Sequence, residues 1–253
     1  MQTPKVLRRS FKGDKLYLLP LGDFHIGSPT HDREKLKGYI DWALEHNAQI
    51  LLMGDIIEMA TRYSVGAGVY EQIKNPQEQI EEAITLLEPL AKKGLILGAL
   101  QGNHEFRAAK ETGIDVMKML ANDYRVRIPY LGYSIFLHLS INGIVYIVYA
   151  AHGASGSTTI QGRVQAVSKW ARDVEADLFL HAHLHDLLTW ADVKRCVDRT
   201  TKAEMEKRRY YAITGSFMKY HGSYAEMKGY SPVKTGAPRI RLSGKKHDIH
   251  VSI

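Results

Sequence analysis

Short apolar runs recur along the chain, and five of them end directly before a group of polar residues. Runs of this length beside glycine or polar residues predict buried strands rather than helices. The five segments are KLYLLPLGDFH (15–25), AQILLMGDIIE (48–58), GLILGALQGNH (94–104), IVYIVYAAHG (144–153) and DLFLHAHLHD (177–186). The pattern therefore predicts five strands that each end in polar side chains.

Apolar residues at helical spacing occupy the stretches between these runs. They predict three helices, over residues 32–47, 75–94 and 163–176. Asp32 is placed to cap the first helix. Pro76 suits the first helical position of the second helix, and Gly94 suits its end.

Turn signals and later apolar runs complete the pattern. Asn142-Gly143 lies between two apolar runs and predicts a two-residue β-hairpin, while residues 210–220 and 240–253 predict further strands. Strands that alternate with helices, followed by a hairpin and more strands, predict an α/β fold with a mixed sheet layered against helices. The glycine-containing loop 61–72 follows a strand end, where it would be either a substrate-facing lid or a plain connector.

Length and composition fit one globular domain. The chain has 253 residues, of which 45% are hydrophobic and 24% charged, and we expect a single domain over residues 1–253. No apolar run approaches the roughly 20 residues of a membrane span, so no membrane partner is expected. The single cysteine, Cys196, excludes an internal disulfide and a cysteine-rich zinc site. With no recognisable signal peptide, we expect a cytoplasmic location.

Positive charge is concentrated late in the chain. Of the formal net charge of +7, residues 1–185 contribute nothing, with 20 Lys and Arg against 20 Asp and Glu, whereas residues 186–253 carry 14 against 7. This asymmetry indicates either a polyanionic partner such as nucleic acid or a solvated basic surface. We expect the section 187–253 to complete a sheet and to contact substrate. Its basic residues include Lys194, Arg195, Arg199, Lys202, Lys207, Arg208 and Arg209, and aromatic residues that could stack bases follow at Tyr210, Tyr211, Phe217, Tyr220, Tyr224 and Tyr230.

The polar residues after the five strands are all of oxygen or nitrogen ligand type. They are Asp23 and His25, Asp55, Asn103 and His104, His152, and the alternating His181, His183 and His185. In open α/β sheets, ligands bind beyond the carboxyl ends of the strands. Carboxylate, imidazole and amide oxygen together suit manganese, iron, zinc or nickel. A carboxylate that bridges two cations about 3.5–4 Å apart suits attack on phosphorus by a metal-bound hydroxide.

In this order, DFH, GD, GNHE, HG and HAHLH resemble the D-x-H, G-D, G-N-H-[DE], H and G-H-x-H motifs of the calcineurin-like metallophosphoesterases. The resemblance covers roughly residues 15–186. It implies a four-layer α/β/β/α sandwich of two mixed sheets, with a dinuclear metal centre at one edge. The compact size resembles the DNA-repair nuclease branch of the superfamily and its short bacterial or phage relatives.

The resemblance also implies a role for each matching residue. The first metal would be held by Asp23, His25 and His185, the second by Asn103, His152 and His183, and Asp55 would bridge both. His104 would bind no metal and would be catalytic, either stabilising the transition state or protonating the leaving oxygen. Two divalent ions are expected, manganese first, with iron, zinc or nickel as alternatives.

One position departs from the family motif. Ala182 stands where glycine normally precedes the first paired histidine, and glycine there would permit close backbone approach. An alternative register would pair His181 with His183 as ligands, instead of His183 with His185. Three neighbouring residues have weaker expected roles. Glu105 would brace its loop, Glu58 would be a partner of a metal ligand, and Arg107 would contact phosphate.

The expected activity is hydrolysis of nucleic-acid or nucleotide phosphodiesters. Alternatives are a phosphomonoesterase or a Ser/Thr protein phosphatase, because GNHE is shared with the protein phosphatases. The G-D motif here reads GDIIEM, however, and lacks the arginine-bearing form that the phosphatases carry. A non-catalytic nucleic-acid-binding relative and a metal-dependent structural subunit are further alternatives, although no metal ligand of the family pattern is missing.

Overall fold

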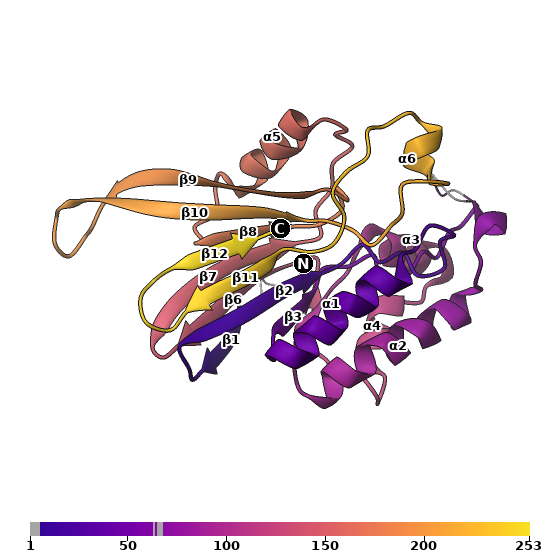
Figure 1. Cartoon of the computed structure of the whole chain (residues 1–253), viewed down its shortest axis with the longest axis horizontal. Coiled ribbons are helices and arrows are strands. Elements are labelled where there is room, and N and C mark those ends of the chain that lie inside the picture. The colour runs from indigo at the N-terminus through magenta and orange to yellow at the C-terminus, as the bar shows by residue number, and fades with distance from the viewer. Residues whose placement is uncertain (1–5, 63, 65–67) are drawn as a thin grey trace.

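Two mixed sheets of six strands each form the centre of the computed structural model, which describes residues 6–62, 64 and 68–253 (Figure 1). Sheet A has the strand order β1 (Val6–Phe11), β6 (Ser134–Ile141), β7 (Ile144–Ala151), β8 (Leu178–His181), β10 (Glu204–Thr214) and β9 (Leu187–Val197). Sheet B has the order β12 (Ile249–Ser252), β11 (Arg239–Ser243), β2 (Lys15–Leu21), β3 (Gln49–Leu52), β4 (Ile96–Leu100) and β5 (Tyr130–Gly132).

Helices cover the outer face of each sheet. Sheet B is covered by α1 (Arg33–His46), α2 (Pro76–Lys92), α3 (Asn103–Thr112) and α4 (Val116–Asn122), and sheet A by α5 (Ile160–Ala171). The 3-10 helix η1 (Val69–Glu71) and the short helix α6 (Tyr224–Met227) lie in connecting loops. The order helix, sheet, sheet, helix confirms the predicted four-layer α/β/β/α fold.

Three apolar cores hold these layers together. One contains Leu36 and Leu87 and lies between sheet B and its helices. A second contains Leu18 and Leu137 and lies between the two sheets, and a third lies under α5 around Phe179. Strands β2, β3 and β4 have apolar neighbours on both faces, which explains why their sequences are continuous apolar runs.

The five predicted strand ends all lie at one edge of the sandwich. The predicted runs correspond to β2, β3, β4, β7 and β8. Strands β2, β3 and β4 are parallel in sheet B, and β7 and β8 are parallel in sheet A. Because parallel neighbours end on the same side, the polar residues after these strands meet in space.

Two of the three predicted helices match the structure closely. Asp32 caps α1 by accepting a hydrogen bond from the Lys35 amide at 3.2 Å. Asn75 caps α2 in the same way, Pro76 is its first residue, and Gly94 after it has the left-handed φ of 65°. The predicted hairpin is also confirmed, with positive φ at Asn142 and at the glycine after it.

The third helix begins and ends earlier in the sequence than predicted. It runs over Ile160–Ala171 rather than 163–176, because the Thr159 side chain accepts from the Gly162 amide and caps the helix there. The chain then turns, with the Val174 amide donating to the Ala171 carbonyl at 3.2 Å. Apolar Val174 packs against the core under α5 after this turn, so its spacing imitated one more helical turn.

Several elements have no counterpart in the predicted pattern. Strand β1 is exposed along most of its length, and helix α3 begins at the Asn103 motif itself. The largest omission is β9 together with the outer part of β10, because the predicted strand over 210–220 covers only Tyr210–Thr214 of β10. The two strands pair over eleven residues each and form a hairpin that projects to the left in Figure 1. Its outer half extends beyond the neighbouring strands into solvent, so its residues do not show an apolar face.

The remaining expectations concern a loop and a membrane. Residues 63 and 65–67 of the loop 61–72 lie outside the described residues, so the lid prediction for that loop is untested. Among the described residues, no helix has the length and apolar character needed to cross a membrane.

Tyr146 links the two sheets through its hydroxyl group, which gives a test of the fold. This buried hydroxyl lies 2.7 Å from the Ser243 carbonyl, and the Asp248 amide donates to it at 3.0 Å. Tyr146→Phe should lower the free energy of unfolding by about 1–3 kcal/mol, because the turn after β11 loses its partner. Urea unfolding followed by circular dichroism measures this change.

Tyr124→Phe is the matched control for this substitution. Its side chain is 80% exposed, and surface changes of this kind alter stability by less than about 0.5 kcal/mol. Equal unfolding midpoints for the Tyr146→Phe variant and the control would contradict the proposed link between the sheets.

Candidate metal centre

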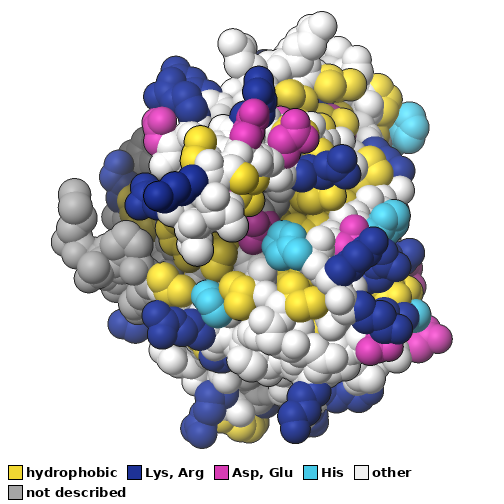
Figure 2. All heavy atoms as spheres, turned by 90° about the vertical axis from the view of Figure 1, so that its left-hand side faces the viewer, with side chains coloured by type: hydrophobic (Ala, Val, Ile, Leu, Met, Phe, Trp, Pro, Cys, Tyr) yellow, Lys and Arg dark blue, Asp and Glu magenta, His cyan; other side chains and the backbone are white. Residues whose placement is uncertain are grey.

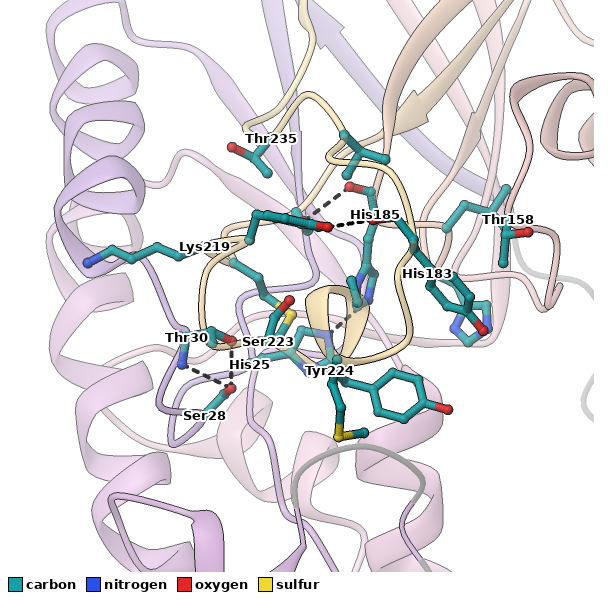
Figure 3. A pocket seen from close by; sticks show the side chains of 18 of the residues that line it. His25, Ser28, Thr30, Thr158, His183, His185, Lys219, Ser223, Tyr224 and Thr235 are labelled. Carbon is teal, nitrogen blue, oxygen red and sulfur yellow. Dashed lines mark hydrogen bonds between the residues drawn. The ribbon is translucent and has the colours of Figure 1, made fainter.

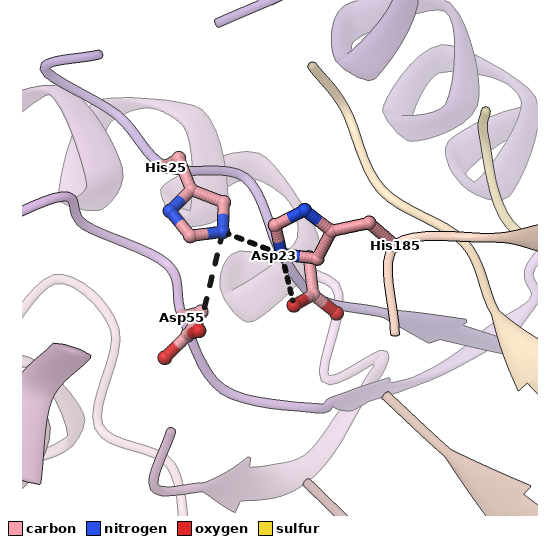
Figure 4. Close-up of side chains that lie close together, drawn as sticks. All are labelled: Asp23, His25, Asp55 and His185. Atoms are coloured by element: carbon pink, nitrogen blue, oxygen red, sulfur yellow. Dashed lines mark hydrogen bonds and ion pairs between the residues drawn. The ribbon is translucent and has the colours of Figure 1, made fainter. Parts of the chain in front are cut away.

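The polar residues from the five strand ends converge in two overlapping groups. In the first, ligand atoms of Asp23, His25, Asp55 and His185 all lie within 4.8 Å of one another (Figure 4). The Nε2 atoms of His25 and His185 are 3.1 Å apart, and His185 Nε2 lies 3.2 Å from an oxygen of Asp23. These are the residues that the sequence motifs assign to a first metal, together with the bridging carboxylate.

The second group contains Asp55, His152 and His183. His152 Nε2 lies 3.3 Å from Asp55 Oδ2 and 2.9 Å from Asn103 Oδ1. The other ring nitrogen of His152 lies 2.8 Å from the Met53 carbonyl, which fixes the ring orientation. The motifs assign the same histidines and asparagine to a second metal.

Asp55 is oriented so that one oxygen faces both groups. Its Oδ1 accepts a hydrogen bond from the His104 backbone amide at 2.9 Å. Its buried Oδ2 has no hydrogen-bond partner among the described residues, and the same is true of Asp23 Oδ1 and His183 Nδ1. Buried carboxylate oxygens without a donor are costly unless a cation neutralises them. The set of donor atoms therefore fits divalent cations.

The backbone at the site adopts a conformation that side chains usually avoid. Five of the converging residues have φ between 49° and 67°, namely Asp23, His25, Asp55, His183 and His185. Left-handed backbone at residues other than glycine costs energy and clusters at functional sites. Here it turns successive side chains toward one centre directly after each strand ends.

Two glycines allow the strand ends to approach this closely. A Cβ on Gly102 would lie 2.1 Å from Asp55 Oδ1, and one on Gly54 would lie 2.5 Å from the Gly102 amide nitrogen. Gly54 also has a φ of 90°, which favours glycine. The glycines of the G-D and G-N-H motifs are therefore required by the packing of one loop on the other.

Glu105 braces these loops, as the sequence indicated. Its buried carboxylate accepts hydrogen bonds from the backbone amides of Asp55, Ile56, Ile57 and Gly102 at 2.7–3.3 Å. Burial and the charge of Asp55 raise the pKa of Glu105 to about 7, against the effect of these four donors. The residue holds the loop of the bridging carboxylate and does not itself face the cavity.

Glu58 supports two of the site histidines. Its Oε2 lies 2.9 Å from His25 Nδ1, so His25 directs its other nitrogen toward Asp55 and His185. The backbone carbonyl of Glu58 lies 2.6 Å from His104 Nδ1. His25, Glu58 and His104 form a third group of close ligand atoms, which the motifs did not predict as a unit.

The charges of the site favour bound cations. Burial would raise the pKa of Asp55, but the positive charge of His152 and His104 outweighs it and holds that pKa well below its usual value. Burial would lower the pKa of His152, but Asp55 raises it to about 10. Protonated His152 thus supplies positive charge that a divalent cation beside Asp55 would supply instead.

The third histidine of HAHLH has a different environment. His181 is buried, packs edge-on against Trp170 at 5.2 Å and directs Nδ1 to the Ala182 carbonyl. Burial lowers its pKa to about 4, so it is neutral. No group of potential metal ligands among the described residues includes it. The geometry favours His183 with His185 over the alternative register.

Alanine is accommodated where the family motif has glycine. Ala182 is fully buried in the core between the sheets, and it is absent from the residues with positive φ within the described ranges. The position therefore requires neither a left-handed backbone nor a missing side chain, and the methyl group packs with the apolar residues between the sheets.

A buried ion pair beside the site had no sequence signal. Arg163 at the start of α5 lies 2.6 Å from Asp186, the residue after His185. Arg163 also donates to the Ser157 carbonyl at 3.3 Å. The pair connects α5 and the loop before it to the histidine turn. Arg107, the expected phosphate contact, instead lies 2.9 Å from His104 Nδ1.

A cavity of about 570 Å³ lies over the histidines (Figure 3). Its floor includes His25, His104, His183 and His185. Its walls are the loop 155–158 and a longer loop over residues 216–236, which contains α6 and which we call the roof loop. The roof loop contributes three aromatic residues to the cavity lining, Tyr220, Tyr224 and Tyr230. Tyr211 and Phe217, in contrast, are buried in the cores, as sheet packing predicts.

The basic cluster lies on the projecting hairpin. Lys194 and Lys207 lie opposite each other on the two strands, seven residues from the end of the hairpin that is next to the site. At 3.3 Å per residue, this separation is roughly 23 Å. Three of its members are engaged in ion pairs, Arg195 with Glu204, Lys207 with Glu175 and Arg209 with Asp192. On the face shown in Figure 2, Lys and Arg side chains are scattered among Asp, Glu and hydrophobic side chains and form no continuous basic patch.

Comparison with known proteins finds solved structures similar to this chain but no similar sequence. No family model matches the sequence, and the curated proteins yield no relative. Vacuolar Protein Sorting 29 from Cryptosporidium parvum matches with a TM-score of 0.46 and 12% identity, covering 95% of this chain and 98% of its own. A predicted phosphoesterase from Streptococcus pneumoniae TIGR4 matches with a TM-score of 0.41 and 14% identity, covering 94% and 98%. A metallophosphoesterase from Sphaerobacter thermophilus matches with a TM-score of 0.39 and 12% identity, covering 94% of this chain and 89% of its own.

At such identities and TM-scores, the similarity carries no information on what this chain binds or hydrolyses. The order of the motifs, the four layers and the converging ligand atoms are features of the chain itself. Together they define a four-layer α/β/β/α fold with a possible metal site at the carboxyl ends of its strands.

Gly102→Ala tests the close approach of the two loops. The added methyl group would displace the Asp55 carboxylate, so binding of Mn²⁺ or Zn²⁺ should weaken at least tenfold in isothermal titration calorimetry. Gly38→Ala is the matched control, because a Cβ there meets nothing within 4 Å inside α1. The control should bind cations normally and unfold at a slightly higher temperature. Equal cation affinity in both variants would refute the packing requirement.

Proposed function

We propose that this chain is a dinuclear metal-dependent phosphoesterase that acts on phosphodiesters of nucleotides or nucleic acid. The observation that carries the proposal is the orientation of Asp55, whose buried Oδ2 lies 3.3 Å from His152 Nε2 and 3.9 Å from His25 Nε2. A single buried oxygen that faces two histidine groups fits a bridge between two cations. Manganese is the first metal to test, and iron, zinc and nickel accept the same oxygen and nitrogen ligands.

The proposed ligands divide between the two groups. Asp23, His25 and His185 would hold one ion, and Asn103, His152 and His183 the other, with Asp55 shared. Bound there, divalent cations lower the pKa of water and neutralise phosphoryl oxygens. Glu58 would orient His25, and Glu105 would keep the Asp55 loop in place.

His104 is the proposed catalytic residue. It lines the cavity, and its Nδ1 is engaged by the Glu58 carbonyl at 2.6 Å. Its Nε2 is thereby directed toward the centre, 3.9 Å from Asp55 Oδ2. From this position a protonated imidazole can donate the Nε2 proton to the leaving oxygen, which is general acid catalysis.

Hydrolysis of small chromogenic esters tests the proposal. The protein with Mn²⁺ should hydrolyse bis-p-nitrophenyl phosphate, and EDTA should abolish the activity. Metal analysis should find two ions per chain. Absence of turnover with two ions bound would refute the enzyme and favour a non-catalytic relative. Turnover of p-nitrophenyl phosphate alone would instead favour the phosphomonoesterase or protein-phosphatase alternative.

Two substitutions should separate metal binding from catalysis. His104→Asn should reduce kcat about 10²–10⁴-fold with both ions retained, because only the proton donor is lost. Asp55→Asn should reduce the number of bound ions, because the bridge loses its charge. His138→Asn, in the middle of β6 and away from the site, serves as the control and should match the wild type. Loss of metal in the His104→Asn variant would contradict its assignment as an unliganded residue.

A further inference from the structure

The roof loop is a closed excursion between β10 and β11. Its two ends meet, because the Gly236 amide donates to the Ser216 carbonyl at 2.8 Å. Further out, the Tyr220 hydroxyl donates to the Tyr230 carbonyl at 2.7 Å and ties the two arms together. A loop whose ends are joined twice forms a compact unit rather than an open connection.

The base of the roof loop is fixed to the metal centre itself. The Phe217 amide donates to the Asp23 carbonyl at 3.0 Å, and its ring packs edge-on against Phe24. The Ser216 hydroxyl lies 3.1 Å from the His185 carbonyl. Lys219 adds a contact to the loop after β2, with its amide donating to Thr30 at 2.7 Å. The base of the roof loop is therefore fixed beside the site.

The cavity under the roof has the size of a small-ligand pocket. Its volume of about 570 Å³ lies within the range of roughly 300–1,000 Å³ that suits small ligands. Tyr224 and Tyr230 line the cavity with their rings edge to face at 6.4 Å and with Lys228 over the Tyr224 ring, and Ser155, Ser157 and Thr158 line it from the loop 155–158. Aromatic faces suit a base, and hydroxyl groups suit a sugar.

The charges of the lining do not form a path for a long phosphate backbone. Among the described residues that line the cavity, Lys219 and Arg163 are the only Lys or Arg. Arg163 is already paired with Asp186. A groove that follows a polymer needs a series of basic side chains. Here the basic cluster lies further out on the hairpin, with Lys194 and Lys207 roughly 23 Å along the strands from its site end.

We propose that the roof loop is a size filter that admits one nucleotide unit to the metal centre, either a small diester or the end of a single strand, and excludes internal phosphodiesters. Tyr224 is its specificity-determining residue and contacts the base. This inference rests on the proposed function for its catalytic part, but the nucleotide pocket itself can be tested by binding alone.

The first experiment uses the wild-type protein with Mn²⁺ and substrates that differ in whether they have ends. The p-nitrophenyl ester of thymidine 5′-phosphate and a linear oligonucleotide should be hydrolysed, whereas a covalently closed single-stranded DNA circle should be cut at least 100-fold more slowly per phosphodiester. Cleavage of the circle at a comparable rate overturns the size filter while leaving the phosphoesterase proposal intact.

The second experiment shortens the roof. Replacing residues 221–229 with Gly-Ser-Gly removes α6 but keeps the base of the loop, since Tyr220 and Tyr230 are already linked. The variant should cut the circle at least tenfold faster, relative to bis-p-nitrophenyl phosphate, than the wild type does. An unchanged ratio in a protein with native circular dichroism overturns the proposal.

A milder substitution and a binding measurement cover the case in which the shortened protein misfolds. Tyr224→Ala should weaken binding of thymidine 5′-phosphate in calorimetry by about 5- to 100-fold, as expected for loss of a stacking ring, and should leave inorganic phosphate unaffected. Tyr124→Ala, exposed and placed before β5 at the opposite end of sheet B, is the matched control. Equal loss for nucleotide and phosphate, or no loss for either, overturns the pocket.

Binding also distinguishes the two proposals from each other. Selective nucleotide binding that depends on Tyr224, without turnover of any ester, would refute the enzyme and support the pocket. Turnover of bis-p-nitrophenyl phosphate without any nucleotide preference would support the enzyme and refute the pocket.

Discussion

The buried carboxylate of Asp55 is the constraint on which the rest of the site depends. A charged group with an unpartnered oxygen in the interior is costly unless positive charge stands beside it. The surroundings supply histidines on two sides, a backbone amide on the other oxygen, and Glu105 as a brace beneath the loop. Gly54 and Gly102 permit the contact between loops that puts these groups in reach. Charge balance and close packing are therefore satisfied by the same few residues.

The layered fold places this centre where the chain can vary without loss of the core. Three apolar cores hold sheets and helices together, and the site lies beyond the strands at one edge. The segments that surround the centre are loops, namely 155–158 and the roof loop. A rigid frame with variable loops at the strand ends can keep one chemistry and change its substrates.

Charge is distributed differently from what the sequence suggested. Half of the fourteen Lys and Arg residues after residue 185 lie on the β9–β10 hairpin, where ion pairs with Glu204, Glu175 and Asp192 engage three of them. The aromatic residues that follow it divide into buried packing residues and those of the roof loop. A contiguous basic and aromatic stretch in the sequence thus becomes two separate surfaces, one distant from the metal centre and one above it.

Hydrophobic patterning was sufficient to predict the five strands and two of the helices, because burial imposes a periodicity that neighbouring residues record. The ordered motifs indicated which polar residues would share a site, because each follows a strand directly. Tertiary structure alone decided what depended on distant parts of the chain: the Arg163–Asp186 pair, the length of the exposed hairpin and the roof over the cavity. It also distinguished His181 from His185, because His181 packs against Trp170 whereas His185 lies beside Asp23.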